Sequence, residues 1–300
     1  MKARSPGLVL ALAIVGISFA GPLVKLSAAD PIAIAVWRLG FSLIIVAGFL
    51  IATGEWRQWR NVSVRDGLLA IVAGVALAFH FAAWNASIHM TTIAASVVLV
   101  NLQPAVILVI SAIFLREHPS YRQFIGIAIA LLGALIIAAP DFLRSHDSTD
   151  LSTLGNILAI SAAVTAAIYY SIGRSMRASY GVWAYVGLAY TACFVTLLIL
   201  GVATRAPLYP QPPRELWIFA ALAIGPMLFG HTGMNWALKF LPAYVVSLVI
   251  LGEPIGATVL GMILPGIRQI PPLLTVVGGV VILIGVLITM RSTRESSTSV

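Results

Sequence analysis

Long apolar runs dominate this chain and limit the folds that are open to it. Ten of them are about 20 residues long, the length that an α-helix needs to cross the hydrocarbon core of a bilayer. A transmembrane β-strand would instead be a run of about ten residues with alternating polarity. The sequence therefore predicts an all-α polytopic membrane protein with ten transmembrane helices. The predicted spans are 7–27, 31–52, 67–89, 92–114, 120–139, 153–175, 182–203, 215–238, 242–263 and 271–290.

Composition excludes several classes of protein. Hydrophobic residues make up 60% of the chain and charged residues only 9%, whereas a soluble domain carries about 25% charged residues. This excludes a soluble enzyme, a disordered tail and a nucleic-acid-binding module. The single cysteine, Cys193, lies in an apolar run, so neither a disulfide framework nor a cysteine metal site is expected. No His-Glu-x-x-His, Gly-x-Ser-x-Gly or P-loop motif is present, and we expect no enzyme activity, no cofactor and no metal.

The distribution of basic residues predicts the topology. If the N-terminus is cytoplasmic, twelve of the 18 Lys and Arg residues lie on the cytoplasmic side and five on the outer side, with Arg38 inside a span. This matches the positive-inside rule. The apolar stretch from Gly7 to Leu26 is too long for a signal peptide and is interpreted as a retained first span. We expect a multi-pass protein of the cytoplasmic (inner) membrane with both termini in the cytoplasm. The twelve cytoplasmic bases are Lys2, Arg4, Arg57, Arg60, Arg65, Arg116, Arg122, Arg174, Arg177, Lys239, Arg291 and Arg294, and the five outer ones are Lys25, Arg144, Arg205, Arg214 and Arg268.

The two halves of the chain share a layout. Asn85 and Pro104 recur 150 residues later as Asn235 and Pro254, and Gly126 and Gly133 recur 152 residues later as Gly278 and Gly285. Because five is an odd number, a second unit of five helices enters the membrane with the opposite orientation. The pattern predicts two inverted five-helix repeats with a site between them near the bilayer midplane. The expected divisions are 1–140 for the first repeat, 141–151 for an outer linker, 152–291 for the second repeat and 292–300 for a cytoplasmic tail.

Pro104 and Pro254 lie near the middle of the fourth and ninth predicted helices. Proline has no N–H for the carbonyl four residues earlier, so the carbonyls of Val100 and Ile250 lose their helical partners. An unsatisfied carbonyl is costly in lipid and is tolerated where it faces protein or a wet cavity. A kink satisfied by a neighbouring helix is the alternative. The matched positions favour two helix breaks that line a cavity.

Ionisable residues inside predicted spans are functional hypotheses. Glu253 is the only acid deep inside a span. It can alternate between a neutral and a charged form, which suits proton coupling, although a paired structural glutamate is the alternative. Arg38 needs an anion, a carbonyl or water as a partner, and it could bind a substrate carboxylate or Glu253, or stabilise the outer interface.

Other polar and aromatic residues complete the candidate site. His80 and His231 lie within the third and eighth helices and could relay protons, or could simply hydrogen-bond between helices. No His, Cys, Asp or Glu cluster suggests a metal. Among the tyrosines 169, 170, 185, 190 and 244, each is a weak candidate on its own. The expected cavity residues are Arg38, His80, Trp84, Asn85, Asn101, Gln103, Tyr169, His231, Asn235, Trp236 and Tyr244, and the proton carriers are Glu253, His80 and His231.

Several stretches resemble a known family. They include WRLGFSLIIVAG in the second predicted helix, HFAAWNASIHMTTIAASVVLVNLQP from the third into the fourth, and GNILAISAAVTAAIYYSIGR in the sixth. The chain resembles the EamA branch of the drug/metabolite transporter superfamily over nearly its whole length. The resemblance implies ten spans in two five-helix units, cytoplasmic termini, and transport of small metabolites. The second unit departs from the pattern, because its ninth helix ends in MILPGIRQ where the first unit has Leu115-Arg116-Glu117.

The expected function is secondary transport of small polar or amphipathic metabolites, most of all amino-acid-like ones, in the outward direction by alternating access. Protons are the candidate driver, and facilitated diffusion is the alternative. A lipid flippase, or a membrane sensor or scaffold on the same fold, is the competing function. The expected partners are a small-molecule substrate, the lipid bilayer and protons, with no nucleic acid, and the protein is expected to be a monomer or a homodimer.

Overall fold

The structure is a computed structural model that describes residues 6–91, 93–115, 117, 119–144, 150–263 and 273–298. Every regular element in these ranges is a helix. Some residues of the predicted topology lie outside the described residues, namely Lys2, Arg4, Arg116, His118, Arg268 and the break at 265–272.

Six helices among the described residues are long and apolar enough to cross a membrane. Local signals fix their ends. The Asp30 side chain accepts a hydrogen bond from the Ile32 amide at the start of α3, and Gly54 ends the same helix in the left-handed region with φ of 71°, which glycine adopts without steric cost. These helices are α1 (Pro6–Ser18) with α2 (Ala20–Leu26), α3 (Pro31–Thr53), α4 (Val64–Met90), α8 (Asp150–Arg177), α9 (Val182–Thr204), and α10 (Pro213–Leu222) with the π-helical η3 (Ala223–Thr232) and α11 (Gly233–Ala237).

The other helices have shorter apolar stretches or are interrupted. The sequence predicts single helices over 92–114 and 242–263, whereas the structure has α5, α6 and the π-helical η2 in the first segment and two helices in the second. α7 and α14 extend past their predicted spans, into the predicted linker and tail, because no glycine stands there to end them. Residues 145–149 of that linker and 299–300 of that tail lie outside the described residues. The elements are η1 (Glu55–Asn61), α5 (Ile93–Val100), α6 (Gln103–Ile110), η2 (Ser111–Leu115), α7 (Tyr121–Arg144), α12 (Ala243–Ile250), α13 (Glu253–Ile263) and α14 (Leu273–Thr298).

The α5–α6 and α12–α13 breaks have the same backbone geometry. In the first, the Leu102 amide donates to the Leu99 carbonyl (3.2 Å) and the Val106 amide donates to the Leu102 carbonyl (3.4 Å). Pro104 occupies the second position of α6, where a missing N–H costs no helical hydrogen bond. Each proline therefore begins a new helix after a tight turn rather than kinking a continuous one. The matching bonds of the second break run from Gly252 to Val249 (3.0 Å) and from Gly256 to Gly252 (3.1 Å).

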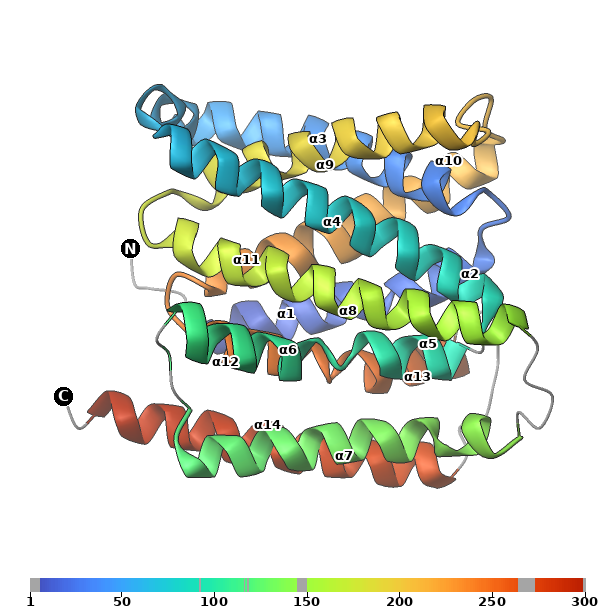
Figure 1. Cartoon of the computed structure of the whole chain (residues 1–300), viewed down its shortest axis with the longest axis vertical. Coiled ribbons are helices and arrows are strands. Elements are labelled where there is room, and N and C mark those ends of the chain that lie inside the picture. Colours follow the sequence, from blue (N-terminus) through green and yellow to red (C-terminus); the bar gives the residue numbers. More distant parts are fainter. Residues whose placement is uncertain are drawn as a thin grey trace.

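The helices run roughly parallel to one another, and α7 and α14 form a pair at one edge (Figure 1). Glycines bring this pair together. A Cβ atom on Gly126 would lie 2.7 Å from the Gly285 carbonyl oxygen, and one on Gly133 would lie 2.7 Å from the Gly278 carbonyl oxygen. The two contacts run in opposite chain directions, so α7 and α14 are antiparallel. Small residues at such crossings allow close backbone packing in lipid.

The surface and the interior have the opposite polarity from those of a soluble protein. Large apolar side chains such as Ile44, Phe114 and Val202 are 70%, 77% and 76% exposed, while Arg38, Asn101 and Glu253 are buried. A bilayer is the solvent that accepts such a surface, since continuous apolar patches are rare on soluble monomers. The chain is an integral, multi-pass membrane protein.

Candidate functional site

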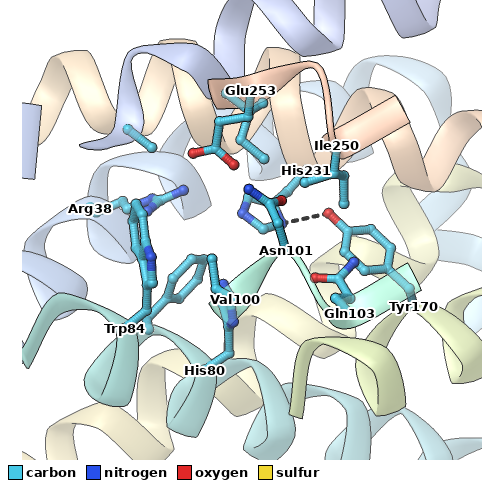
Figure 2. A pocket seen from close by; sticks show the side chains of 13 residues that line it. Arg38, His80, Trp84, Val100, Asn101, Gln103, Tyr170, His231, Ile250 and Glu253 are labelled. Carbon is cyan, nitrogen blue, oxygen red and sulfur yellow. Dashed lines mark hydrogen bonds between the residues drawn. The ribbon is translucent and has the colours of Figure 1, made fainter. Parts of the chain in front are cut away.

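A cavity lies where the two helix breaks meet in the middle of the bundle, with about 400 Å³ of empty space in and around it that includes open solvent. Figure 2 shows its lining side chains converging from both halves of the chain. The first half contributes from α1, α2, α3, α4 and the α5–α6 break, and the second half from α8, η3 and the α12–α13 break. The lining residues are Ile17, Ala20, Arg38, His80, Phe81, Trp84, Val100, Asn101, Gln103, Tyr170, His231, Ile250 and Glu253.

Arg38 from α3 provides the cation of this cavity. Its side chain is 1% exposed, and its guanidinium carbon lies 4.2 Å from the centre of the Phe81 ring. Stacking on an aromatic face stabilises the cation. The Nε and Nη2 atoms of Arg38 have no hydrogen-bond partner in the protein. The guanidinium is thus fixed by stacking while its donors remain available, and guanidinium geometry suits a carboxylate.

Glu253 provides the acid, and it occupies the same place in the second break that Gln103 occupies in the first. Each is the first residue of its helix, α13 or α6, and each lines the cavity. Glu253 interacts electrostatically with Arg38, and both side chains border the same part of the cavity (Figure 2). The positive end of the α13 dipole also favours a carboxylate at this position. The site therefore contains one basic and one acidic side chain that face a shared space.

Two histidines meet at the cavity, but each already uses one ring nitrogen. His80 Nδ1 lies 2.9 Å from the Ala162 carbonyl oxygen, and His231 Nδ1 lies 2.8 Å from the Tyr170 hydroxyl oxygen. The two imidazole rings are 6.1 Å apart between centroids. Both rings experience the positive charge of Arg38, so a second cation there is unfavourable. Each imidazole ring is thus held in a fixed orientation by its Nδ1 contact.

Three further buried donors point to a ligand rich in acceptor atoms. Trp84 Nε1, Gln103 Nε2 and Asn101 Nδ2 have no partner in the protein, and neither does Asn101 Oδ1. Buried polar groups in folded proteins are nearly always hydrogen-bonded. A cluster of such groups around one cavity is the arrangement of a site that binds a polar molecule.

The structure places other predicted site residues outside the cavity lining. Asn85 donates from Nδ2 to the Pro31 carbonyl (3.0 Å), and Asn235 donates to the Tyr169 hydroxyl (2.6 Å) and the His231 carbonyl (2.7 Å). Tyr169 is completely buried among these contacts. These residues join helices next to the site rather than lining it.

Trp236 and Tyr244 lie at the helix ends. Trp236 packs against Phe240 with ring centroids 4.6 Å apart. Tyr244 donates from its hydroxyl to Gln123 Oε1 (3.0 Å) on α7. Pro104 and Pro254 shape the two breaks and are buried, without being part of the lining.

Sequence reasoning missed several lining residues. Tyr170, not its neighbour Tyr169, reaches the cavity, because adjacent helical residues point in directions about 100° apart. Phe81 follows His80 directly, and its ring both supports Arg38 and lies 5.3 Å from the His231 ring. The apolar lining residues carry no signal that separates them from ordinary core positions. Among the described residues, no three His, Cys, Asp or Glu side chains lie close enough together to hold a metal ion.

A sequence model of the EamA-like transporter family matches residues 6–139 and, separately, residues 153–291. The chain belongs to the EamA-like transporter family. This confirms the resemblance seen in the sequence, and the family itself gives the protein its general role as a membrane transporter. The two matched segments correspond to the two halves that meet at the cavity.

Individual relatives of this EamA-like transporter agree with that assignment. It is 28% identical over 293 residues to an uncharacterized transporter of Archaeoglobus fulgidus, covering 95% of this chain and 98% of the relative. It is 26% identical to the uncharacterized transporter YxxF of Bacillus subtilis, over 80% of this chain and 75% of the relative. A crystal structure superposes with a TM-score of 0.76 at 15% identity, covering 98% of this chain and 100% of the other, which shows a shared fold.

Proposed function

We propose that this EamA-like transporter is a secondary carrier, not an enzyme, which moves small amino-acid-like metabolites outward across the cytoplasmic membrane by alternating access. The observation that carries the proposal is the central cavity, where Arg38, Glu253 and unpaired donors from both halves face one space. A site near mid-depth between two halves is what a carrier needs to expose its cargo to each side in turn.

The proposed carrier has ten membrane crossings in two inverted five-helix repeats, 1–140 and 152–291, joined by an outer linker at 141–151. The equivalent hydrogen bonds of the two breaks support this arrangement. The glycine contacts between α7 and α14 support it too, because a twofold axis that exchanges Gly126 with Gly278 also exchanges Gly285 with Gly133. An axis that relates antiparallel helices lies perpendicular to them, and therefore in the plane of the membrane.

The packing of the other helices follows the same exchange. α1 packs on η3 as α8 packs on α4, and α1 packs on α13 as α8 packs on α5 and α6. α3 packs on α9 and α7 packs on α14. In each of these pairs the two helices hold the same position in the two proposed repeats. Rocking of one half against the other would open the cavity to opposite sides of the membrane.

The proposed orientation places both termini and the tail at 292–300 in the cytoplasm. α1 begins and α14 ends at the same end of the bundle (Figure 1). The same end carries Arg57, Arg60, Arg65, Arg174 and Arg177, and a surplus of basic residues is typical of the cytoplasmic side.

The lining chemistry suits a molecule with a carboxylate and an amino group. A carboxylate would accept hydrogen bonds from the free Nε and Nη2 atoms of Arg38, and an ammonium group would bind Glu253. Phe81, Trp84 and Tyr170 leave an aromatic wall for an apolar side chain. For a substrate that lacks an ammonium group, the proton is the candidate driver, with Glu253 rather than His80 or His231 as its carrier, because both histidine rings already bond to a neighbour and lie near Arg38.

Flux in liposomes tests this function. Purified protein reconstituted into liposomes should move radiolabelled L-phenylalanine with saturable kinetics, and Arg38→Gln should remove that flux. Arg65→Gln, at an exposed position in the first turn of α4, is the matched control and should transport normally. Scrambling of a fluorescent phospholipid without solute flux would instead support the flippase function.

A further inference from the structure

Two carboxylates would compete for the one fixed cation of the cavity, that of Glu253 and that of a bound substrate. Arg38 is the only Lys or Arg in the lining, and Glu253 is the only Asp or Glu. Glu253 already interacts with Arg38, although no contact within 4.0 Å joins their charged atoms among the ion pairs of the described residues. The space between them is therefore where a substrate carboxylate would enter, and it would compete with Glu253 for the same guanidinium.

Charge balance then decides what else must bind. A buried cavity with one cation and two carboxylates carries a net negative charge, which is strongly unfavourable in a medium of low polarity. Two additions restore neutrality. Either Glu253 takes a proton from water, or the substrate brings its own ammonium group.

The groups around Glu253 provide no third way to balance the charge of a second carboxylate. The elements packed against α13 are α1, α2 and α14. α1 has no ionisable side chain, Lys25 of α2 is exposed, and the ionisable residues of α14 follow its apolar stretch. Across the cavity lie Arg38 of α3, His80 of α4, Tyr170 of α8 and His231 of η3, with Tyr190 and Cys193 of α9 near Arg38.

The two histidines do not supply a second cation easily. Their Nδ1 atoms bond to the Ala162 carbonyl and to the Tyr170 hydroxyl. A positively charged imidazole ring would also be repelled by the guanidinium of Arg38. The proton that balances a second carboxylate therefore goes to Glu253.

We infer that the complex with a monocarboxylate at Arg38 holds one more proton, at Glu253, than the complex with a zwitterionic amino acid, because the ammonium group of the amino acid takes the place of that proton. This inference rests on the proposed function. It makes coupling a property of the substrate's charge, so that one cavity carries amino acids passively and couples monocarboxylates to the proton gradient.

Proton counting on two matched ligands tests the inference. 3-Phenylpropanoate and L-phenylalanine differ only by the amino group, and both fit the aromatic wall of the cavity. Titration calorimetry on the protein in lipid nanodiscs near neutral pH, in two buffers with different ionisation enthalpies, gives the number of protons taken up with each ligand. We expect 3-phenylpropanoate to take up one proton more than L-phenylalanine does.

Glu253→Gln provides the second measurement. It should bind 3-phenylpropanoate with no proton uptake, and it should bind L-phenylalanine about 10- to 100-fold more weakly, since a charge-assisted contact to the ammonium group is lost. Equal proton counts for the two ligands in the unmodified protein, or the same one-proton difference between them in Glu253→Gln, would overturn the inference. Flux of L-phenylalanine with equal counts would leave the proposed function standing, whereas absence of binding and flux for both ligands would overturn both proposals.

Discussion

The two helix breaks have the same backbone and different side chains. Leu99 to Val106 and Val249 to Gly256 make equivalent hydrogen bonds and place proline second in the new helix. At the first residue of that helix, however, the first break has the neutral amide of Gln103 and the second has the carboxylate of Glu253. The repeated backbone builds a cavity from both sides, and one substitution between the repeats gives it a single acid.

This comparison separates what symmetry provides from what breaks it. Positions that are alike in both halves, such as the glycines of α7 and α14, serve packing and should respond alike to mutation. Positions that differ, such as 103 and 253, should respond differently and should control transport. The predictions below follow that division.

The largest expected effect is on packing at symmetric positions. Gly133→Val and Gly285→Val should each destabilise the protein by about 3 kcal/mol, since a Cβ at either site would lie within 2.7 Å of backbone atoms of the other helix. Thermal unfolding in detergent measures the loss. Gly48→Val is the control, because a Cβ there has no atom within 4 Å. A clear difference between the two variants would argue against an equivalent pairing of α7 and α14.

The next effect concerns the acid that only one break has. In Glu253→Gln the two breaks become chemically alike, and uptake of 3-phenylpropanoate should no longer respond to a pH gradient. A gradient of one pH unit supports about tenfold accumulation with one coupled proton, and this factor should fall to about one. Gln103→Ala is the matched change in the other break and should keep the response. Proton-driven accumulation in Glu253→Gln would remove this residue from the coupling mechanism.

A charge exchange between the breaks sharpens the comparison. The double variant Gln103→Glu/Glu253→Gln moves the carboxylate to the equivalent position in the other break, which lines the same cavity. We expect part of the pH-gradient response to return, measured in the same liposome assay. A double variant as insensitive as Glu253→Gln alone would mean that the cavity distinguishes its two sides.

The smallest effect is expected at the prolines. Pro104→Ala and Pro254→Ala should each lower stability by only about 0.5–1 kcal/mol, because proline at this position breaks no helical hydrogen bond and acts mainly by restricting the unfolded chain. Denaturation in detergent should give similar losses for both. A loss of several kcal/mol at only one proline would contradict the equivalence of the two breaks.

Much of the fold could be predicted from the sequence because lipid imposes simple rules. Spans of about 20 apolar residues and punctuation such as Asp30-Pro31 gave the positions of most helices, and the matched prolines at 104 and 254 gave the positions of the breaks within a few residues. The exact break, after Val100 and Ile250 rather than at the prolines, could not be read in this way. The π-helical geometry of η3 could not be predicted either, because no local motif indicates it.

The site was predicted less completely. Arg38, Glu253 and Gln103 line the cavity as their rarity inside apolar spans suggests. Asn85 and Asn235 look equally promising in sequence, yet Asn85 binds the Pro31 carbonyl of α3. Asn235 binds the Tyr169 hydroxyl of α8 and the His231 carbonyl one turn earlier. A polar side chain in a span needs a partner, and the sequence does not say whether that partner is protein or ligand.

The sequence by itself determined that this protein is a bundle of membrane helices, that its halves repeat, and that one acid and one base lie inside it. Only the tertiary structure decided which side chains share the central space and which of them stay unpaired. The reason is that lipid and protein core are both apolar, so hydrophobicity fixes the length of each helix but not its rotation about its own axis. That rotation, set by packing between helices, makes Tyr170 rather than Tyr169 a wall of the cavity and turns Arg38 and Glu253 toward the same space.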